Sequence, residues 1–225
     1  MKTYFIVLLS FCTYISIGQS DSTAIQTTTQ GATNEYWEYE RVLYPPKFEI
    51  GGGIFIPQGK LATFITPSPF IGVEIYIPTK RNKSIAIVSQ FVLPSQEDRF
   101  IIENPNVIDQ VEAVRSNLII NTFLRFSQNL IPIDNASKLE LGLGVGISTM
   151  FVQTPFSFFN DEGENANRGL VSFLIAPGLH WKFKPTENTD LTIGVDLQYS
   201  PYKLKGALEQ DIGGLAISPK ILYRF

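Results

Sequence analysis

The chain has 225 residues, a length suited to one domain, and only 17% of them are charged. Soluble domains average about 25% charged residues, and a membrane-spanning helix needs a run of about 18 or more apolar residues, which this chain lacks. The formal net charge is −3 and no basic patch stands out, which argues against nucleic-acid binding.

Residues 1–18 have the features of a secretory signal peptide. Lys2 supplies the positive start, residues 4–17 form the apolar centre, and small residues precede the expected cleavage, so we expect Gln19 to begin the mature chain. The apolar centre is short for an uncleaved anchor helix. Cys12 raises the alternative of a lipoprotein, but a bulky residue precedes it. Because Cys12 is the only cysteine, the mature chain would have neither a disulfide nor a thiolate metal site.

Residues 19–46 differ in composition from the rest, and we expect them to be a periplasmic extension. Their first half is rich in Thr, Gln and Ser and is predicted to be disordered or extended. Several Tyr residues and a Trp follow between residues 36 and 44. Rings of this kind favour a membrane–water boundary, although a sticky linker explains the same pattern.

From Phe48 onward, eight segments show the period-2 alternation of β-strands. The fifth is the clearest, because leucine, valine and isoleucine alternate with glutamate, glycine and serine. The connections after the second, fourth and sixth strands are short or moderate, and the others are longer. We predict strands at residues 48–56, 70–77, 84–93, 116–126, 139–148, 170–183, 191–199 and 214–225.

Two prolines fall inside these strands, Pro177 in the sixth and Pro219 in the eighth. Proline has no N–H for the hydrogen-bond ladder, and a closed barrel has no free edge to hold it. We therefore expect a bulge or a local break at each. The sixth strand also carries Leu170 and Leu174 on its nominally inner face.

The pattern predicts an all-β fold, an eight-stranded antiparallel up-and-down transmembrane β-barrel over residues 47–225. Lipid cannot satisfy backbone N–H and C=O groups, so a sheet in the membrane must close, and strands of about 9–11 residues are long enough to cross. The alternative is a soluble β-sandwich or a lipocalin-like barrel with its apolar face inside. Gly142, Gly144 and Gly146 on the polar face fit better inside a narrow barrel, where space is short.

The last strand ends Ile-Leu-Tyr-Arg-Phe, with Tyr223 and Phe225 on its apolar face. It resembles the last strand of bacterial outer-membrane β-barrels, in which a terminal Phe belongs to the signal read by the barrel-assembly machinery. The barrel segment resembles small eight-stranded barrels of the OmpA/OmpX type and the PorT-like family. The resemblance implies an outer-membrane location, with membrane lipid, lipopolysaccharide and the assembly machinery as partners.

Parity also places charged side chains on the inner face of the barrel. Buried charges must pair or cost several kcal/mol each, so we expect three ion pairs. These are Arg125 with Glu140, Asp196 with Lys220, and Arg224 with Glu49 where the last strand meets the first. The expected structural network consists of Glu49, Glu74, Arg125, Glu140, Asp196, Lys220 and Arg224.

No motif for catalysis, a cofactor or a metal emerges from the sequence. The alternate glycines of the fifth strand lack the spacing of a phosphate-binding loop. His180, the only histidine, is expected at the periplasmic end of its strand, whereas barrel enzymes that trim lipid A work at the outer leaflet. Residues 161–165 form an oxygen-rich loop without the spacing of an EF-hand calcium site.

These observations predict a non-enzymatic outer-membrane protein with a structural or surface-interaction role through its extracellular loops. The PorT-like resemblance implies an alternative, a subunit of an outer-membrane secretion or transport assembly with an envelope protein as partner. The architecture alone does not choose between them, because it hosts many functions.

Overall fold

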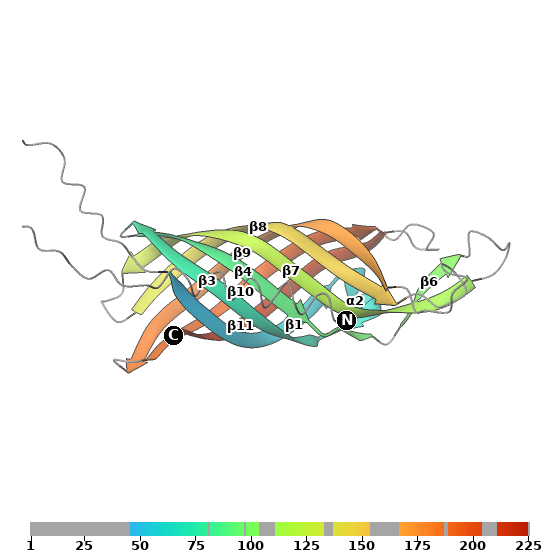
Figure 1. Ribbon diagram of the computed structural model, residues 1–225, viewed down its shortest axis with the longest axis horizontal. Coiled ribbons are helices and arrows are strands. Elements are labelled where there is room, and N and C mark those ends of the chain that lie inside the picture. The colour runs from blue at the N-terminus through green and yellow to red at the C-terminus, as the bar shows by residue number, and fades with distance from the viewer. Residues whose placement is uncertain are drawn as a thin grey trace, which may run out of the picture. The chain divides into compact units, whose positions relative to one another are not determined.

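The computed structural model describes residues 46–224, except 81, 97, 104–110, 133–136, 154–166, 187–188 and 204–210. Eight antiparallel strands close into a barrel (Figure 1). They are β1 (Lys47–Gln58), β3 (Ser68–Lys80), β4 (Lys83–Val92), β7 (Val111–Pro132), β8 (Ser137–Gln153), β9 (Asn167–Thr186), β10 (Thr189–Lys203) and β11 (Asp211–Arg224). Strands β1 and β11 pair, and β4 pairs with β7, which completes the ring and confirms the predicted fold class.

The two ends of the barrel differ. At one end, called here the short-turn end, brief connections at 81–82, 133–136 and 187–188 join β3 to β4, β7 to β8 and β9 to β10. At the other, the long-connection end, the first two connections carry elements that the sequence did not predict. These are α2 (Leu61–Phe64), β2 (Ile65–Thr66), β5 (Ser95–Gln96) and β6 (Phe100–Glu103).

The added elements are tied together and to the barrel. Strand β2 pairs with β5, and β6 pairs with the first residues of β7. Within the part of the chain that the structure describes, no helix is long and apolar enough to cross a membrane.

The outer surface of the barrel is apolar on all eight strands. Leu143 on β8 is 51% exposed and Val171 on β9 is 69% exposed, although both are aliphatic. Soluble monomers rarely expose contiguous apolar patches larger than a few hundred Å², whereas a lipid-facing barrel needs such a band. The exposed apolar side chains include Ile50, Ile71, Ile87, Phe126, Leu143, Phe173, Val195 and Ile221.

Strand β7 is longer than predicted, and its parity changes near its beginning. Its register with β8 shifts between Ser116 and Leu118, and an extra residue at such a bulge turns the following side chains to the opposite face. Val114 and Ser116 are buried before the shift, and Ile119 is buried after it. The shift therefore keeps apolar side chains in the lumen at the long-connection end.

Neither Pro177 nor Pro219 causes a register shift. Pro177 pairs in register with Leu143 on β8, and Pro219 pairs in register with Val195 on β10. Toward the other neighbour, β10 for Pro177 and β1 for Pro219, the paired positions skip the proline while the register is kept. Each proline lacks one N–H and so interrupts one ladder only. Of the two expected alternatives, a bulge or a local break, the structure shows the local break at each proline.

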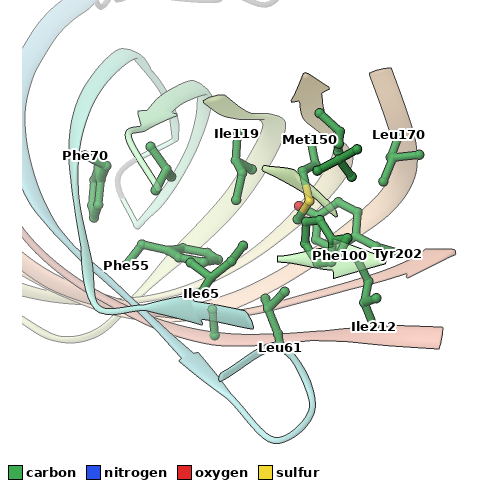
Figure 2. Packing of buried hydrophobic residues seen from close by; sticks show 14 residues of the cluster. Phe55, Leu61, Ile65, Phe70, Phe100, Ile119, Met150, Leu170, Tyr202 and Ile212 are labelled. Carbon is green, nitrogen blue, oxygen red and sulfur yellow. The ribbon is translucent and has the colours of Figure 1, made fainter. Parts of the chain in front are cut away.

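The lumen near the long-connection end is filled with apolar side chains (Figure 2). The barrel strands contribute Phe55, Ile119 and Met150, among others, and the connecting elements add more. This cluster explains why Leu170 points inward, since it packs with apolar neighbours there. The added elements contribute Leu61 from α2, Ile65 from β2 and Phe100 from β6, all buried.

Candidate functional site

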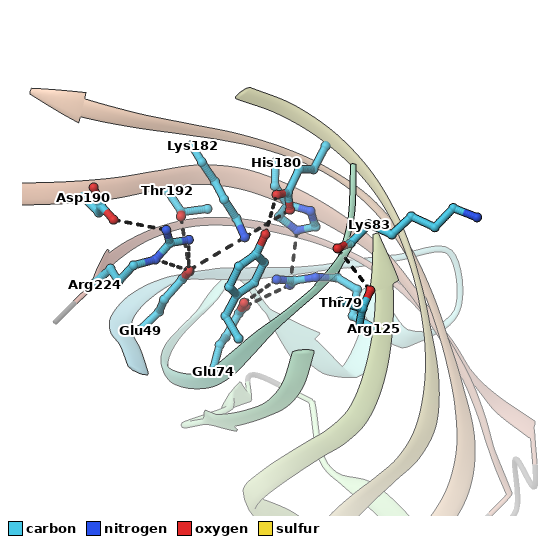
Figure 3. Close-up of polar contacts among 12 residues, drawn as sticks. Glu49, Glu74, Thr79, Lys83, Arg125, His180, Lys182, Asp190, Thr192 and Arg224 are labelled. Atoms are coloured by element: carbon cyan, nitrogen blue, oxygen red, sulfur yellow. Dashed lines mark hydrogen bonds and ion pairs between the residues drawn. The ribbon is translucent and has the colours of Figure 1, made fainter. Parts of the chain in front are cut away.

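The lumen near the short-turn end is charged instead (Figure 3). The alternation of the strands places the polar residues inside, because every other side chain of a barrel strand faces the lumen. Seven of the eight strands contribute, all except β4. The charged side chains and the histidine of this lumen are Glu49, Glu74, Arg125, Glu140, His180, Lys182, Asp196, Lys220 and Arg224.

The deeper part of this network centres on Glu74 of β3. Arg125 of β7 donates two hydrogen bonds to Glu74, one of them at 3.0 Å from Nη1 to Oε1. Lys220 of β11 lies with its Nζ 2.6 Å from Glu74 Oε1 and 2.8 Å from Asp196 Oδ2. Asp196 in turn lies 2.9 Å from Nε2 of His180. Two cations, Arg125 and Lys220, thus neutralise two carboxylates, Glu74 and Asp196, at the centre of the barrel.

The outer part of the network lies at the seam between β1 and β11. Arg224 donates from Nε to Glu49 Oε1 at 2.8 Å and from Nη1 to Asp190 Oδ2 at 3.1 Å. Thr192 donates to the second oxygen of Glu49 at 3.2 Å. Glu49 and Arg224 face each other in the register of the two strands, so this contact lies at the strand pair that closes the ring.

A third group of contacts is built around Lys182 and lies beside the seam, 3.8 Å from Glu49. Lys182 of β9 lies with its Nζ 3.0 Å from Glu140 Oε2 and 3.3 Å from the centre of the Tyr76 ring. The Tyr76 hydroxyl donates to Glu140 Oε1 at 3.0 Å. The lysine therefore has both a carboxylate and an aromatic face as partners, and cations are attracted to each.

The structure brings together two of the three ion pairs expected from parity, namely Asp196 with Lys220 and Arg224 with Glu49. The expected pair of Arg125 with Glu140 was wrong. In the register of β7 and β8, Arg125 lies opposite Gly144 and Glu140 lies opposite Asn129, four residues nearer the strand ends. Arg125 instead reaches Glu74 on β3.

Sequence reasoning missed two members of the network, His180 and Lys182. Both lie on β9 and are buried, and they share the parity of Leu170, which was already assigned to the inner face. Applying that parity to the whole strand would have found them. Trp181, next to His180 in sequence, is exposed on the outer face instead, because neighbouring residues of a strand face opposite sides.

Glycines make room for these side chains. A Cβ added to Gly142 would lie 2.9 Å from Cδ of Arg125, and one added to Gly194 would lie 2.4 Å from Cδ2 of His180. Real Cβ atoms do not approach other atoms so closely. The glycines that alternate with apolar residues on the barrel strands are therefore spaces for neighbouring side chains.

A neutral polar layer separates the charged lumen from the apolar cluster. Asn121 donates to Gln198 at 2.8 Å, and Gln198 donates to Gln90 at 2.6 Å. Ser148 bonds both Asn121 and the hydroxyl of Tyr202. The lumen thus changes along its axis from a charged region, through a small apolar cluster that includes Phe123 and Leu174, to the neutral polar layer and then to the larger apolar cluster.

The charged lumen balances itself. Glu49, Glu74, Glu140 and Asp196 stand against Arg125, Lys182, Lys220 and Arg224. Buried charges are tolerated when they pair and hydrogen-bond, and this arrangement meets that condition. Among the residues that the structure describes, no group of three or more His, Cys, Asp or Glu side chains is placed to hold a metal ion.

No family model and no curated protein sequence matches the chain. Among solved structures, Neisserial surface protein A has a similar fold, with a TM-score of 0.53 and 9% identity over 80% of this chain and 95% of that chain. Ail of Yersinia pestis has a TM-score of 0.42 at 13% identity over 80% and 97% of the two chains. E. coli outer membrane protein W has a TM-score of 0.41 at 15% identity over 80% and 98%.

The fold is that of a small outer-membrane β-barrel. At such low identity the likeness concerns the fold alone. In an outer-membrane barrel, the last strand carries apolar residues toward lipid. Tyr223, one of the two residues assigned to the assembly signal, is exposed on the outer face of β11, whereas Phe225 lies outside the described residues, as do the signal peptide, residues 19–45 and the acidic loop at 161–165.

Proposed function

We propose that the protein is a non-enzymatic barrel of the bacterial outer membrane that acts through contacts at its long-connection end, not by passing solutes through its lumen. The observation that supports this most directly is the filled lumen. Eight strands give an interior about wide enough for side chains alone, and here side chains occupy both halves of it.

The long-connection end is closed by structure that belongs to the connections themselves. The ring of Phe64 packs on that of Phe100, with 5.0 Å between their centres. The N–H of Ser95 donates to Oγ of Ser68 at 2.9 Å, and the N–H of Ser116 donates to the side chain of Gln96 at 2.7 Å. An ordered, hydrogen-bonded cover of this kind supports a role in contact rather than in conduction.

The surroundings of the single histidine support a non-enzymatic role. The His180–Asp196 contact resembles two thirds of a catalytic triad, but a triad also needs a hydroxyl nucleophile next to the histidine. Nδ1 of His180 has no hydrogen-bond partner among the described residues, and Nε2 faces Asp196 and Arg125. The histidine is fully buried, where a lipid substrate has no access.

Outer-membrane barrels have short turns on the periplasmic side and longer loops outside. By that rule the long-connection end of this barrel faces the exterior, and the network of charged residues holds the scaffold beneath it. Lipopolysaccharide contact and a secretion partner remain predictions from the sequence, and the described residues hold no feature that favours the second.

Surface labelling and conductance together test the proposal. An epitope inserted within 154–166 should be recognised by antibody on intact cells, and the same epitope inserted within 133–136 should be recognised only after permeabilisation. The purified barrel in a planar bilayer should give no steady, large conductance. The opposite labelling pattern would show that the barrel has the reverse orientation. A steady open-channel current would contradict the filled lumen and favour a pore function.

A further inference from the structure

The short-turn mouth of the barrel carries more positive than negative charge, whereas the charges of the lumen behind it are balanced. Five neighbouring strands, in the order β8, β9, β10, β11 and β1, each place one charged residue there. All five share the parity of the lumen-facing residues on their strands. They are Lys138, Lys184, Asp190, Arg224 and Lys47.

Asp190 is the single carboxylate among these five residues, and it forms ion pairs with three of the four cations. Asp190 lies 3.1 Å from Arg224, 3.8 Å from Nζ of Lys184 and 3.9 Å from Nζ of Lys47. Lys138 acts electrostatically on Lys47, as do Lys184 and Arg224, so the positive charges lie close enough to repel one another. Among the described carboxylates, none forms an ion pair with Lys138.

The surplus can be counted from the described side chains. The buried network is balanced, with Arg224 already matched by Glu49. The mouth then adds Lys47, Lys138 and Lys184 against Asp190 alone. About two positive charges remain, and they are half-exposed: the side chains of Lys47 and Lys184 are 39% and 51% accessible.

We propose that this mouth binds a soluble partner that carries carboxylate or phosphate groups, which would lie among Lys47, Lys138 and Lys184. An added oxyanion would relieve the repulsion between ammonium groups and neutralise the surplus. The three lysines face the lumen side of their strands, whereas lipid headgroups surround the outer side. A soluble anion can approach along the barrel axis, and a lipid phosphate cannot do so without leaving the bilayer plane. The site goes beyond the proposed function, which concerns the opposite end.

The test uses the full mature barrel in nanodiscs of zwitterionic phosphatidylcholine, with fluorescein-labelled hexaglutamate and inorganic pyrophosphate as probes. We expect labelled peptide to bind, pyrophosphate to compete, and affinity to fall as salt is raised, because exposed charges are screened. The double variant Lys138→Ser, Lys184→Ser should weaken binding by about tenfold, since exposed ion pairs contribute up to about 1 kcal/mol each. Lys83→Ser is the matched control, because Lys83 is exposed at the same end but on the outer face.

Each variant is first checked for the heat-modifiable band of a folded barrel, so that a loss of binding reports on the mouth. If only one probe binds and the double variant weakens it, the site holds and its preference for carboxylate or phosphate is assigned. Absence of binding by both probes would overturn the proposal. So would equal weakening by Lys83→Ser, or an effect of the lysines seen only as enrichment of phosphatidylglycerol around the barrel, which would make them a lipid contact.

Discussion

Replacing Arg125 by methionine should destabilise the barrel strongly while leaving its packing nearly unchanged. Arg125 is fully buried and gives two hydrogen bonds to Glu74. Without it, Lys220 alone would face both Glu74 and Asp196. Breaking a buried ion pair by removing one partner costs about 3–5 kcal/mol, and we expect the free energy of unfolding to fall by that amount.

A second substitution locates the partner. Adding Glu74→Gln removes the uncompensated carboxylate and should restore about 1–3 kcal/mol, because residues in one network couple to that extent. Adding Glu140→Gln instead should restore clearly less than Glu74→Gln, because Glu140 makes its hydrogen bond and ion pair with Tyr76 and Lys182 and not with Arg125.

Urea unfolding in lipid vesicles, followed by tryptophan fluorescence and checked for reversibility, measures all these differences. The reasoning fails if Arg125→Met stays within about 1 kcal/mol of the wild type, a loss too small for a broken buried pair. It also fails if Glu140→Gln, and not Glu74→Gln, rescues the variant.

Three further substitutions test the other regions. Leu143→Arg should cost about 2–4 kcal/mol, because it places a charge on the lipid face, and Leu143→Ala should cost less; equal losses in urea unfolding would contradict the assigned outer face. Met150→Ala should cost about 2–5 kcal/mol by opening a cavity in the apolar cluster, and an unchanged unfolding midpoint would mean that the cluster relaxes freely. Gly194→Ala should cost about 1–3 kcal/mol by overpacking and be relieved by His180→Ala, whereas Gly169→Ala, whose added Cβ would meet its nearest atom at 3.5 Å, should be tolerated.

The period-2 pattern was enough to predict the strand number, the inner and outer faces and the location of most lumen charges. These properties depend on local alternation, and a side chain's face follows from its parity along the strand. The pairings between side chains across the lumen also depend on how the strands are placed relative to one another. Arg125 reaches Glu74 because of the stagger between strands and the direction of the side chains, neither of which is visible in one strand's alternation.

The elements of the long connections escaped prediction for a different reason. Helix α2 has only four residues and β2 only two, too few to show a periodic pattern. They are ordered by burial of Leu61 and Ile65 in the apolar cluster, a tertiary effect. The room beside Gly194 likewise depends on His180 from the neighbouring strand, so the tolerance of that glycine to a larger residue is set by the fold and not by its own strand.

The lumen network also bears on how the barrel forms. Lys220 and Glu74 are 146 residues apart, and Arg224 and Glu49 are 175 residues apart. Until the final strand arrives, Glu74 lacks Lys220, one of its two cations, and Glu49 lacks Arg224, because both of these cations lie on β11. Contacts this distant in sequence form late and slowly. Closing the ring therefore supplies the missing backbone hydrogen bonds and the missing charges in one event. A barrel without its last strand is destabilised by both losses, so assembly approaches an all-or-none transition.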